Sequence, residues 1–189
     1  MRIVVTGGPG GGKSTAVDLF RRELGERVVV VPESATMLFS GGFPRTSDAP
    51  SRRHAQRAIF HVQRNLEDLQ ATRYPGRVLL CDRGTIDGAA YWPHTDGDFF
   101  AAMGTTLTAE LARYDAVIFF ESAAVGGMGI EGGNPTRIED DAQAVALDRA
   151  LRALWQGHPR LTVVPHQRSF LAKINTGLAA LQKVVDDGD

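Results

Sequence analysis

The sequence contains very little cysteine, no long hydrophobic run and almost no net charge. Its single cysteine, Cys81, has no partner for an intrachain disulfide, so we expect a reducing, cytoplasmic environment. No apolar stretch approaches the ~20 residues that a membrane-spanning helix needs, and no secretory signal pattern is visible. A net charge of −1 provides no general attraction to nucleic acid or anionic lipid. We therefore expect no membrane association and regard nucleic acid as an unlikely class of partner.

Short apolar runs alternate with segments of helical periodicity along the whole chain. Five runs rich in β-branched residues predict strands buried on both faces, at residues 2–6, 27–31, 77–81, 116–120 and 161–164. Apolar residues recur at steps of three and four in segments 14–24, 51–72, 98–113, 139–155 and 169–185. This alternation predicts a single α/β domain over residues 1–189, with three layers, a mostly parallel five-stranded sheet and helices on both faces.

The loop after the first predicted strand has the sequence GGPGGGKS at residues 7–14 and matches the phosphate-loop pattern G-x-x-x-x-G-K-[ST]. Main-chain N–H groups of such a loop surround a phosphate, and the following helix adds its positive end. We expect Lys13 to contact the β- and γ-phosphates, Ser14 to bind Mg²⁺ and Thr15 to donate to the α-phosphate. The predicted nucleotide-binding residues are Gly8, Pro9, Gly10, Gly11, Gly12, Lys13, Ser14 and Thr15, and the predicted ligands are ATP or GTP with Mg²⁺.

A phosphate loop of this kind needs an acidic residue at the end of a neighbouring strand to hold Mg²⁺, usually through water. Asp82 follows the third apolar run and is the best candidate, whereas Asp115 precedes its strand and is less well placed. Arg83 would clamp a phosphate or an acidic substrate, with Asp87 as a further substrate contact. The alternative is that Arg83 and Asp87 form an ordinary surface ion pair.

Glu33 ends the second predicted strand. Ligands of open α/β sheets bind at the carboxyl ends of the strands, so Glu33 is expected to point into the same region as Lys13 and Asp82. It would orient a substrate hydroxyl or accept its proton. The alternative is that Glu33 caps the short helix that follows.

Together these residues resemble the nucleotide- and nucleoside-kinase branch of P-loop proteins. Thymidylate kinases and deoxyribonucleoside kinases carry a similar Asp-Arg pair after the third strand and a glutamate after the second. The closer likeness is to the AAA_28 domain group, which includes the ribosylnicotinamide kinase domain, and it covers nearly the whole chain. It rests on Pro32–Ala35, Asp82–Gly84 with Asp87, Asn134–Glu139, Leu147-Asp148, Trp155 with His158-Pro159, and Phe170 with Lys173-Ile174.

The resemblance implies the strand order 2-3-1-4-5 rather than the fold of a ring-forming ATPase. It also implies a lid after the fourth strand, at residues 123–137, where several glycines would allow closure. Arg137 at the edge of this lid would then reach the transferring phosphoryl group. The alternative is a flexible loop in which Arg137 pairs with Glu139 or Asp140.

Substrate contacts are also implied by the resemblance. Related kinases hold the acceptor with glutamine and arginine side chains of the second long helix, which makes Gln63 the candidate here; a solvated helix face is the alternative. P-loop kinases often hold the nucleotide base after the last strand, where Arg168 and Lys173 lie. For Lys173 the alternative is a solvated helix residue. Segment 40–57, which includes the aperiodic stretch 40–50, is the expected acceptor-site insertion. It matches no nucleoside-kinase motif and therefore does not identify the acceptor.

Three functions are compatible with these residues. The first is Mg²⁺-assisted transfer of the γ-phosphoryl group of ATP to a nucleoside, nucleotide or riboside, with catalytic roles for Lys13, Glu33, Asp82, Arg83 and Arg137. The second is a nucleotide-dependent switch acting on a protein partner, which would not need Glu33 or the Asp82-Arg83 pair. The third is a nucleic-acid end kinase, which the net charge disfavours. A monomer and a homodimer are both compatible with the sequence.

Overall fold

The computed structural model describes residues 1–93, 95, 97–127 and 140–188. Its centre is a five-stranded sheet of β1 (Arg2–Thr6), β2 (Val28–Val31), β3 (Val78–Asp82), β4 (Ala116–Phe120) and β5 (Leu161–Val164). All neighbouring strands pair in parallel, in the order β2-β3-β1-β4-β5. The predicted three-layer α/β fold and its strand order are therefore confirmed.

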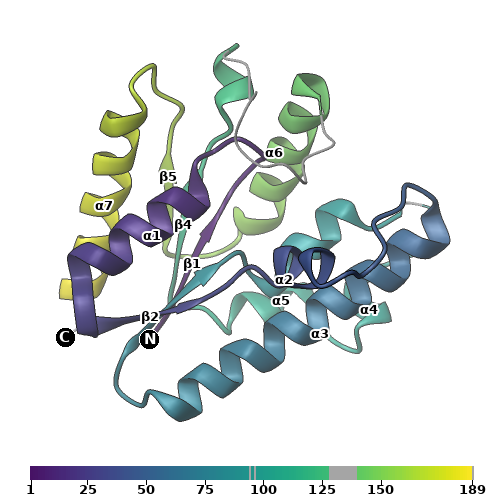
Figure 1. The fold of residues 1–189 in the computed structure, drawn as a ribbon, viewed down its shortest axis with the longest axis horizontal. Helices are drawn as coiled ribbons and strands as arrows, with labels where there is room; N and C mark the ends of the chain where they lie inside the picture. The colour runs from purple at the N-terminus through teal and green to yellow at the C-terminus, as the bar shows by residue number, and fades with distance from the viewer. Residues whose placement is uncertain (94, 96, 128–139, 189) are drawn as a thin grey trace.

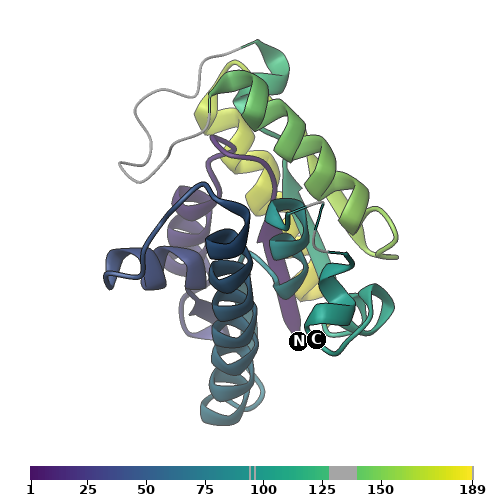
Figure 2. The same cartoon turned by 90° about the vertical axis from the view of Figure 1, so that its right-hand side faces the viewer.

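Helices cover both faces of the sheet (Figures 1 and 2). On one face, α1 (Lys13–Leu24) and α7 (Phe170–Asp186) pack against side chains such as Ile3 and Val5. On the other face, α3 (Ala49–Arg73) and α6 (Asp141–Trp155) pack against a second core that contains Val4. Successive β1 residues thus point into opposite cores, because side chains alternate along a strand.

Two helix predictions need correction. The predicted helix over 98–113 is wrong, because the chain forms α4 (Phe99–Ala102) and α5 (Leu107–Leu111) instead. Gly104 adopts a positive φ of 70° between them, and the Thr106 side chain accepts from the N–H of Ala109 as a new helix cap. Helix α3 begins at Ala49, two residues before the predicted start, because the Asp48 side chain caps it through the N–H of Ser51.

The segments that follow the strands gather at the carboxyl edge of the sheet. They are α2 (Ser34–Ser40) after β2, the 3-10 helix η2 (Thr85–Tyr91) after β3 and the 3-10 helix η4 (Ala123–Gly126) after β4. A further 3-10 turn, η1 (Gly25–Arg27), connects α1 to β2 at the opposite edge. Within the described residues, the search for a helix long and apolar enough to cross a bilayer finds none.

Candidate nucleotide and phosphoryl-transfer site

The phosphate loop connects β1 to α1 in a backbone path that strongly favours glycine. Gly7 has φ 133°, and a Cβ atom there would lie 1.9 Å from the carbonyl oxygen of Phe120. Gly10 and Gly12 also have positive φ, at 73° and 85°. An L side chain at these positions would be strained, and at Gly7 it would also collide with β4. The glycines are thus required by conformation and by space.

The loop presents some of its predicted nucleotide-binding residues to the cavity and turns others towards the protein. Pro9, Gly10, Gly12, Lys13, Ser14 and Thr15 line the cavity. Gly8 and Gly11 are buried, and their N–H groups donate to Asp148 Oδ1 (3.0 Å) and to the Gly8 carbonyl (3.3 Å). The main-chain donors of these two glycines therefore hold the loop in shape rather than pointing at a ligand.

Asp148 of α6 is the anchor of this loop. Its Oδ1 accepts from the N–H of Gly8 and from the N–H of Ser122 at 2.7 Å, and the Ser122 hydroxyl donates to the Pro9 carbonyl at 2.5 Å. Burial raises the pKa of Asp148 despite these two donors. In the sequence Asp148 is recognisable only as part of a motif. Its role as an anchor was not predicted, because its partners Ser122 and Gly8 lie 26 and 140 positions away.

The charges of Lys13 and Asp82 influence each other's pKa at the base of the loop. Burial and the nearby Arg83 charge lower the pKa of Lys13 to about 7, and its ammonium donates to the Gly8 carbonyl at 2.7 Å. Burial and the Glu33 charge raise the pKa of Asp82 to about 6. At pH 7 these pKa values leave Lys13 about half protonated and Asp82 mostly ionised, and the negative charge of a bound polyphosphate would favour the charged form of Lys13.

Asp82 also meets the requirements of a magnesium ligand. It is the last residue of β3 and lies beside Val5 of β1 in the sheet register. Its side chain hydrogen-bonds with Ser14, while its Oδ1 is buried with no hydrogen-bond partner among the described residues. An unpartnered carboxylate oxygen next to a hydroxyl fits a hard cation that takes its other ligands from phosphate and water. Asp115 lies at the opposite edge of the sheet, where it accepts from the Arg2 N–H.

Arg83 is held by contacts to its backbone and its side chain. It is the one non-glycine residue of the described chain with a positive φ, 70°. Its N–H donates to the Val5 carbonyl (3.0 Å), its Nε to Glu33 Oε1 (2.6 Å) and its Nη1 to Asp87 Oδ2 (3.2 Å). Backbone strain at a non-glycine residue persists only where the surroundings over-determine it. The side chains of Arg83 and Asp87 are only 15% and 5% exposed, so they do not form the surface ion pair considered as the alternative.

Asp87, predicted as a substrate contact, uses both carboxylate oxygens within the protein. Oδ2 accepts from the Thr6 hydroxyl (2.6 Å) as well as from Arg83, and Oδ1 accepts from Trp155 Nε1 (2.7 Å). The buried carboxylate of Asp87 therefore connects β1, α6 and Arg83. This arrangement favours positioning of Arg83 over direct contact with a substrate.

Glu33 is placed to stay ionised. Burial would raise its pKa, but the Arg83 charge and a hydrogen bond from the Thr36 hydroxyl (2.5 Å) outweigh burial and leave the pKa below its usual value. Glu33 does occupy the residue before α2, yet its side chain makes no capping hydrogen bond to the helix. The Glu33 side chain therefore does not cap α2, and the alternative role as a helix cap does not hold.

Gln63 lines the cavity, but its amide is occupied by protein groups. Its Nε2 donates to the Arg83 carbonyl and to Glu67 Oε1, both at 3.2 Å, and its Oε1 accepts from the Ser34 N–H at 3.3 Å. Both N–H donors of the amide are thus used. The solvated-face alternative does not hold, since Gln63 is 2% exposed, and its contacts favour a positioning role over the predicted grip on the acceptor.

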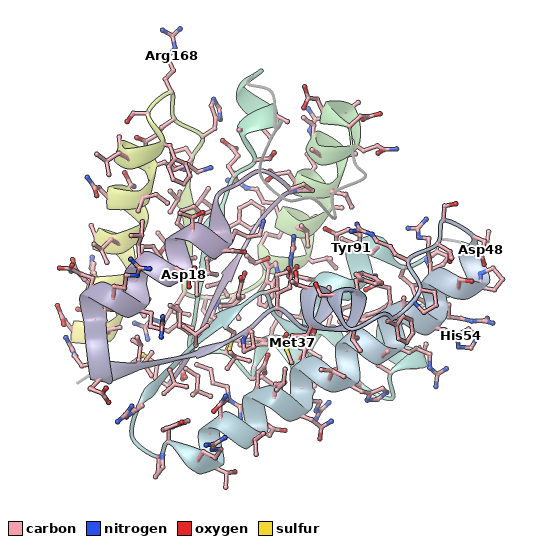
Figure 3. The ribbon with its side chains drawn as sticks, in the orientation of Figure 1. Asp18, Met37, Asp48, His54, Tyr91 and Arg168 are labelled. Carbon is pink, nitrogen blue, oxygen red and sulfur yellow. The ribbon has the colours of Figure 1, made fainter. Side chains whose placement is uncertain are left out.

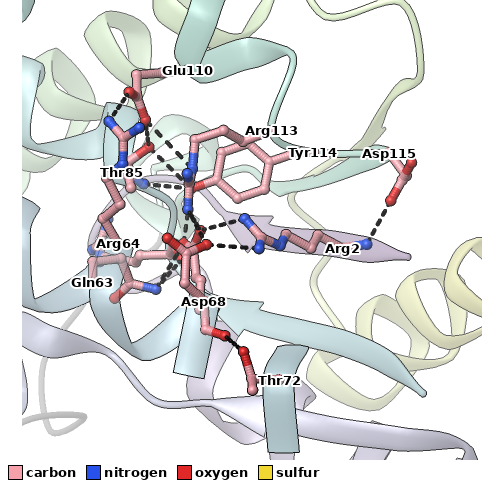
Figure 4. Close-up of polar contacts among 12 residues, drawn as sticks. Arg2, Gln63, Arg64, Asp68, Thr72, Thr85, Glu110, Arg113, Tyr114 and Asp115 are labelled. Carbon is pink, nitrogen blue, oxygen red and sulfur yellow. Dashed lines mark hydrogen bonds and ion pairs between the residues drawn. The ribbon is translucent and has the colours of Figure 1, made fainter. Parts of the chain in front are cut away.

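A buried polar network behind Gln63 fixes the orientation of this amide (Figure 4). Glu67 is fully buried and accepts from Arg113 Nη2 (3.0 Å) and from the Tyr114 hydroxyl (2.9 Å). The Tyr114 hydroxyl in turn accepts from the N–H of Thr85, at the start of η2. These hydrogen bonds connect α3 to η2 next to Arg83. No local pattern in the sequence indicated this network.

One cavity of about 1320 Å³ connects these groups. Phe170, the first residue of α7, lines it next to the phosphate loop, where a Cβ on Gly12 would meet the Phe170 ring at 2.6 Å. Arg168, predicted to contact the base, is exposed, is not among the lining residues and extends away from the fold (Figure 3). Arg137 and most of the predicted lid lie outside the described residues, and residues 123–126 form η4.

We expect nucleotide binding to take up protons above neutral pH. At about pH 8.5 Lys13 in the free protein is mostly neutral, because its pKa is about 7, and bound phosphates raise that pKa again. Binding of magnesium-free ATP should therefore take up close to one proton, and the affinity should fall by up to about tenfold per pH unit above 7. Calorimetry in two buffers of different ionisation enthalpy measures this uptake. An uptake of zero at pH 8.5 would contradict the assignment.

Two solved structures are similar to this chain over nearly their entire length. Thymidylate kinase from Ehrlichia chaffeensis aligns with a TM-score of 0.62 and 16% identity, covering 98% of each chain. Deoxyadenosine kinase from M. mycoides, solved with bound dATP, aligns with a TM-score of 0.67 and 15% identity, covering 96% of this chain and 99% of the other. At such identities the likeness establishes a shared fold, in agreement with the strand order.

No curated protein matches the chain in sequence. A family model described as an AAA domain, AAA_28, matches residues 2–170. Together with the phosphate loop, this match confirms the resemblance to the AAA_28 group. It also implies that the protein binds a nucleotide. The protein belongs to the AAA_28 family of P-loop NTPases.

Proposed function

We propose that the protein transfers the γ-phosphoryl group of ATP, with Mg²⁺, to a small-molecule acceptor of the nucleoside, nucleotide or riboside class. The observation that carries this proposal is one continuous cavity that begins at the phosphate loop and continues past Glu33 and Arg83 to Phe39 and Tyr91. Sites for one drug-sized ligand have volumes of roughly 300–1,000 Å³. A volume of about 1320 Å³ has room for a nucleotide and an acceptor side by side.

The nucleotide end of the cavity would hold the triphosphate. Main-chain donors of the loop and the Lys13 ammonium would bind the β- and γ-phosphates, and Ser14 with Asp82 would hold Mg²⁺, which neutralises phosphate charge when bound. Phe170 offers a half-exposed ring beside the loop, so it replaces Arg168 as our candidate for contact with the base.

The junction of the two halves would perform the transfer. The acceptor oxygen attacks the γ-phosphorus, the bond from that phosphorus to the β–γ bridging oxygen breaks, and ADP leaves. Because the pKa of Glu33 is lowered, we assign it to orient the acceptor hydroxyl by accepting its hydrogen bond, while the proton passes on to water. Arg83 would stabilise the charge that develops on the phosphoryl oxygens. Positioning and electrostatics dominate phosphoryl transfer, so these roles are sufficient.

Segments 40–57 and 123–137 keep their proposed roles as acceptor-site insertion and lid. Arg45, Thr46, Ser47, Arg52 and Gln56 of the first segment line the cavity, which supports the first role. For the second, we propose that Arg137 reaches the phosphoryl group on closure.

Release of ADP in the presence and absence of acceptors tests the proposal. We expect a panel of nucleosides, nucleotides and ribosides to contain a compound that raises ADP release from ATP and Mg²⁺ at least about tenfold, because a correctly bound acceptor outcompetes water through proximity. The Lys13→Ala protein, purified identically, controls for contaminating kinases. Slow ADP release that ignores every acceptor would contradict the proposal and would favour a nucleotide-dependent switch.

A further inference from the structure

Trp155 is a buried aromatic residue that has no role in the transfer described so far. It is the last residue of α6 and is fully buried, which is ordinary for a core tryptophan. Its polar atom, however, is directed at the transfer site, because Nε1 donates to Asp87 Oδ1 at 2.7 Å. The other oxygen of Asp87 accepts from Arg83 Nη1 at 3.2 Å. One carboxylate therefore separates the indole from the Arg83 guanidinium.

The indole also packs on the backbone next to Arg83. A Cβ atom on Gly84 would lie 2.8 Å from Trp155 Cζ2, so the ring fills the space that a side chain at this position would need. Gly84 directly follows Arg83, the residue with a φ of 70°. The Tyr114 ring contacts the indole edge to face, with 5.4 Å between the ring centres. Trp155 thus restrains Arg83 through the Asp87 side chain and through the Gly84 backbone.

Helix α6 connects this restraint to the phosphate loop. Asp148 and Trp155 are seven positions apart and both are buried, so they lie on one face of the helix, two turns or about 10 Å from each other. Asp148 holds the N–H of Gly8, and Trp155 holds Asp87. One helix therefore carries both the anchor of the loop and the support of Arg83. Phosphoryl transfer needs these two parts at a fixed separation.

We propose that Trp155 is a positioning residue, whose indole N–H orients Asp87 so that Asp87 holds the Arg83 guanidinium towards the γ-phosphate at the phosphate loop. This inference rests on the proposed phosphotransferase activity. Trp155 does not line the cavity, so it acts through Asp87 and Arg83 rather than on a ligand. Loss of its hydrogen bond should therefore impair the rate of transfer and leave nucleotide binding intact.

Trp155→Phe tests the role of the indole N–H, because it removes the donor and keeps an aromatic ring. We expect kcat in the acceptor-dependent assay to fall by about 10- to 100-fold, the scale of a small misplacement of a catalytic group. The KM and the calorimetric Kd for ATP should stay unchanged, since the loop and Lys13 are not altered. A kcat equal to that of the parent protein would overturn the proposal.

Trp92→Phe is the matched control for this substitution. Trp92 lies in the same hydrophobic core and is also buried, but its Nε1 has no hydrogen-bond partner among the described residues. It does not line the cavity. The same change of side chain therefore removes no hydrogen bond here, and kcat should remain that of the parent protein. A loss equal to that of Trp155→Phe would show that the indole N–H is not the cause.

A double-mutant cycle separates positioning from general damage to the fold. If Trp155 acts through Arg83, Trp155→Phe should change kcat by less than about twofold in an Arg83→Ala background. Independent effects would multiply instead. An equal fold loss in the parent and in the Arg83→Ala background would overturn the positioning role.

The indole N–H resonances of the parent protein provide a test that needs neither turnover nor a stable Trp155 variant. The chain has two tryptophans, and Trp92→Phe assigns the resonance of Trp155. We expect this resonance to shift with Mg²⁺ and adenylyl imidodiphosphate, a non-hydrolysable ATP analogue, and much less with Mg²⁺ and ADP, because the γ-phosphate attracts the Arg83 guanidinium that faces Asp87. The difference should disappear in Arg83→Ala.

This measurement distinguishes failure of the inference from failure of the proposed function. A bound analogue that leaves the Trp155 resonance where ADP leaves it, in a protein with acceptor-dependent turnover, would refute the positioning role and leave the phosphotransferase activity intact. A shift that depends on the γ-phosphate, without turnover on any acceptor, would refute the phosphotransferase activity and retain the connection from Trp155 through Asp87 and Arg83 to the bound nucleotide.

Discussion

Replacement of Lys13 by alanine is expected to weaken nucleotide binding by about 100-fold. Lys13 is the basic side chain of the phosphate loop itself, and its ammonium donates to the loop carbonyl of Gly8 at 2.7 Å. A charge-assisted hydrogen bond from a buried ammonium contributes up to about 3 kcal/mol, which corresponds to a loss of about 100-fold in affinity. Calorimetric titration with ATP and Mg²⁺ measures this loss.

The fold of the Lys13→Ala protein should remain intact, because burial disfavours the charged ammonium of Lys13 and alanine has no charge to bury. Thermal unfolding checks this point. Lys183→Ala is the matched control, since Lys183 is an exposed lysine of α7, and it should bind ATP as the parent protein does. Wild-type affinity in the Lys13→Ala protein would refute the nucleotide site at this loop.

Replacement of Arg83 is expected to remove turnover while leaving ATP bound. An arginine that stabilises the transition-state charge of a phosphoryl group contributes on the order of 10³-fold in rate. We therefore expect both Arg83→Ala and Arg83→Gly to lower kcat by about that factor in the acceptor-dependent assay. The affinity for ATP should change little, because the loop donors and Lys13 provide most of the phosphate contacts in the proposed arrangement.

The two Arg83 variants should differ in stability rather than in turnover. Arg83 has φ 70°, a conformation that costs an L residue roughly 1 kcal/mol and costs glycine little. Arg83→Gly should therefore have a free energy of unfolding about 1 kcal/mol above that of Arg83→Ala, as measured by denaturant titration. A variant of either kind with turnover near that of the parent protein would count against the catalytic role. Equal stability of the two would count against the strained backbone.

The parts of the site that depend on neighbouring residues were predictable from the sequence. The phosphate loop was predictable because its geometry depends on contiguous glycines and on a strand and a helix that the apolar pattern marks. Asp82 and Glu33 were predictable as neighbours because they end parallel strands, and the carboxyl ends of such strands share one edge of the sheet. The break between α4 and α5 was missed because the apolar spacing continues across Gly104.

Side-chain direction could not be read from the sequence. Gln63 and Asp87 have the residue types of ligand contacts, yet protein groups occupy the amide donors of one and both oxygens of the other. Arg168 and Phe170 lie only two positions apart, but only Phe170 lines the cavity. These outcomes depend on partners brought together from distant parts of the chain.

The sequence by itself determined the α/β fold class, the phosphate loop and the strand-end residues Glu33, Asp82 and Arg83, because each depends on neighbouring residues or on the alternation of strands and helices. Only the tertiary structure decided that Asp148 anchors the loop, that Gln63 and Asp87 hold Arg83, and that Arg45 and Arg52 line the same cavity as Lys13. Those relations depend on packing between α2, α3, α6 and η2. Contacts between residues that are distant in the chain produce no periodic pattern in the sequence.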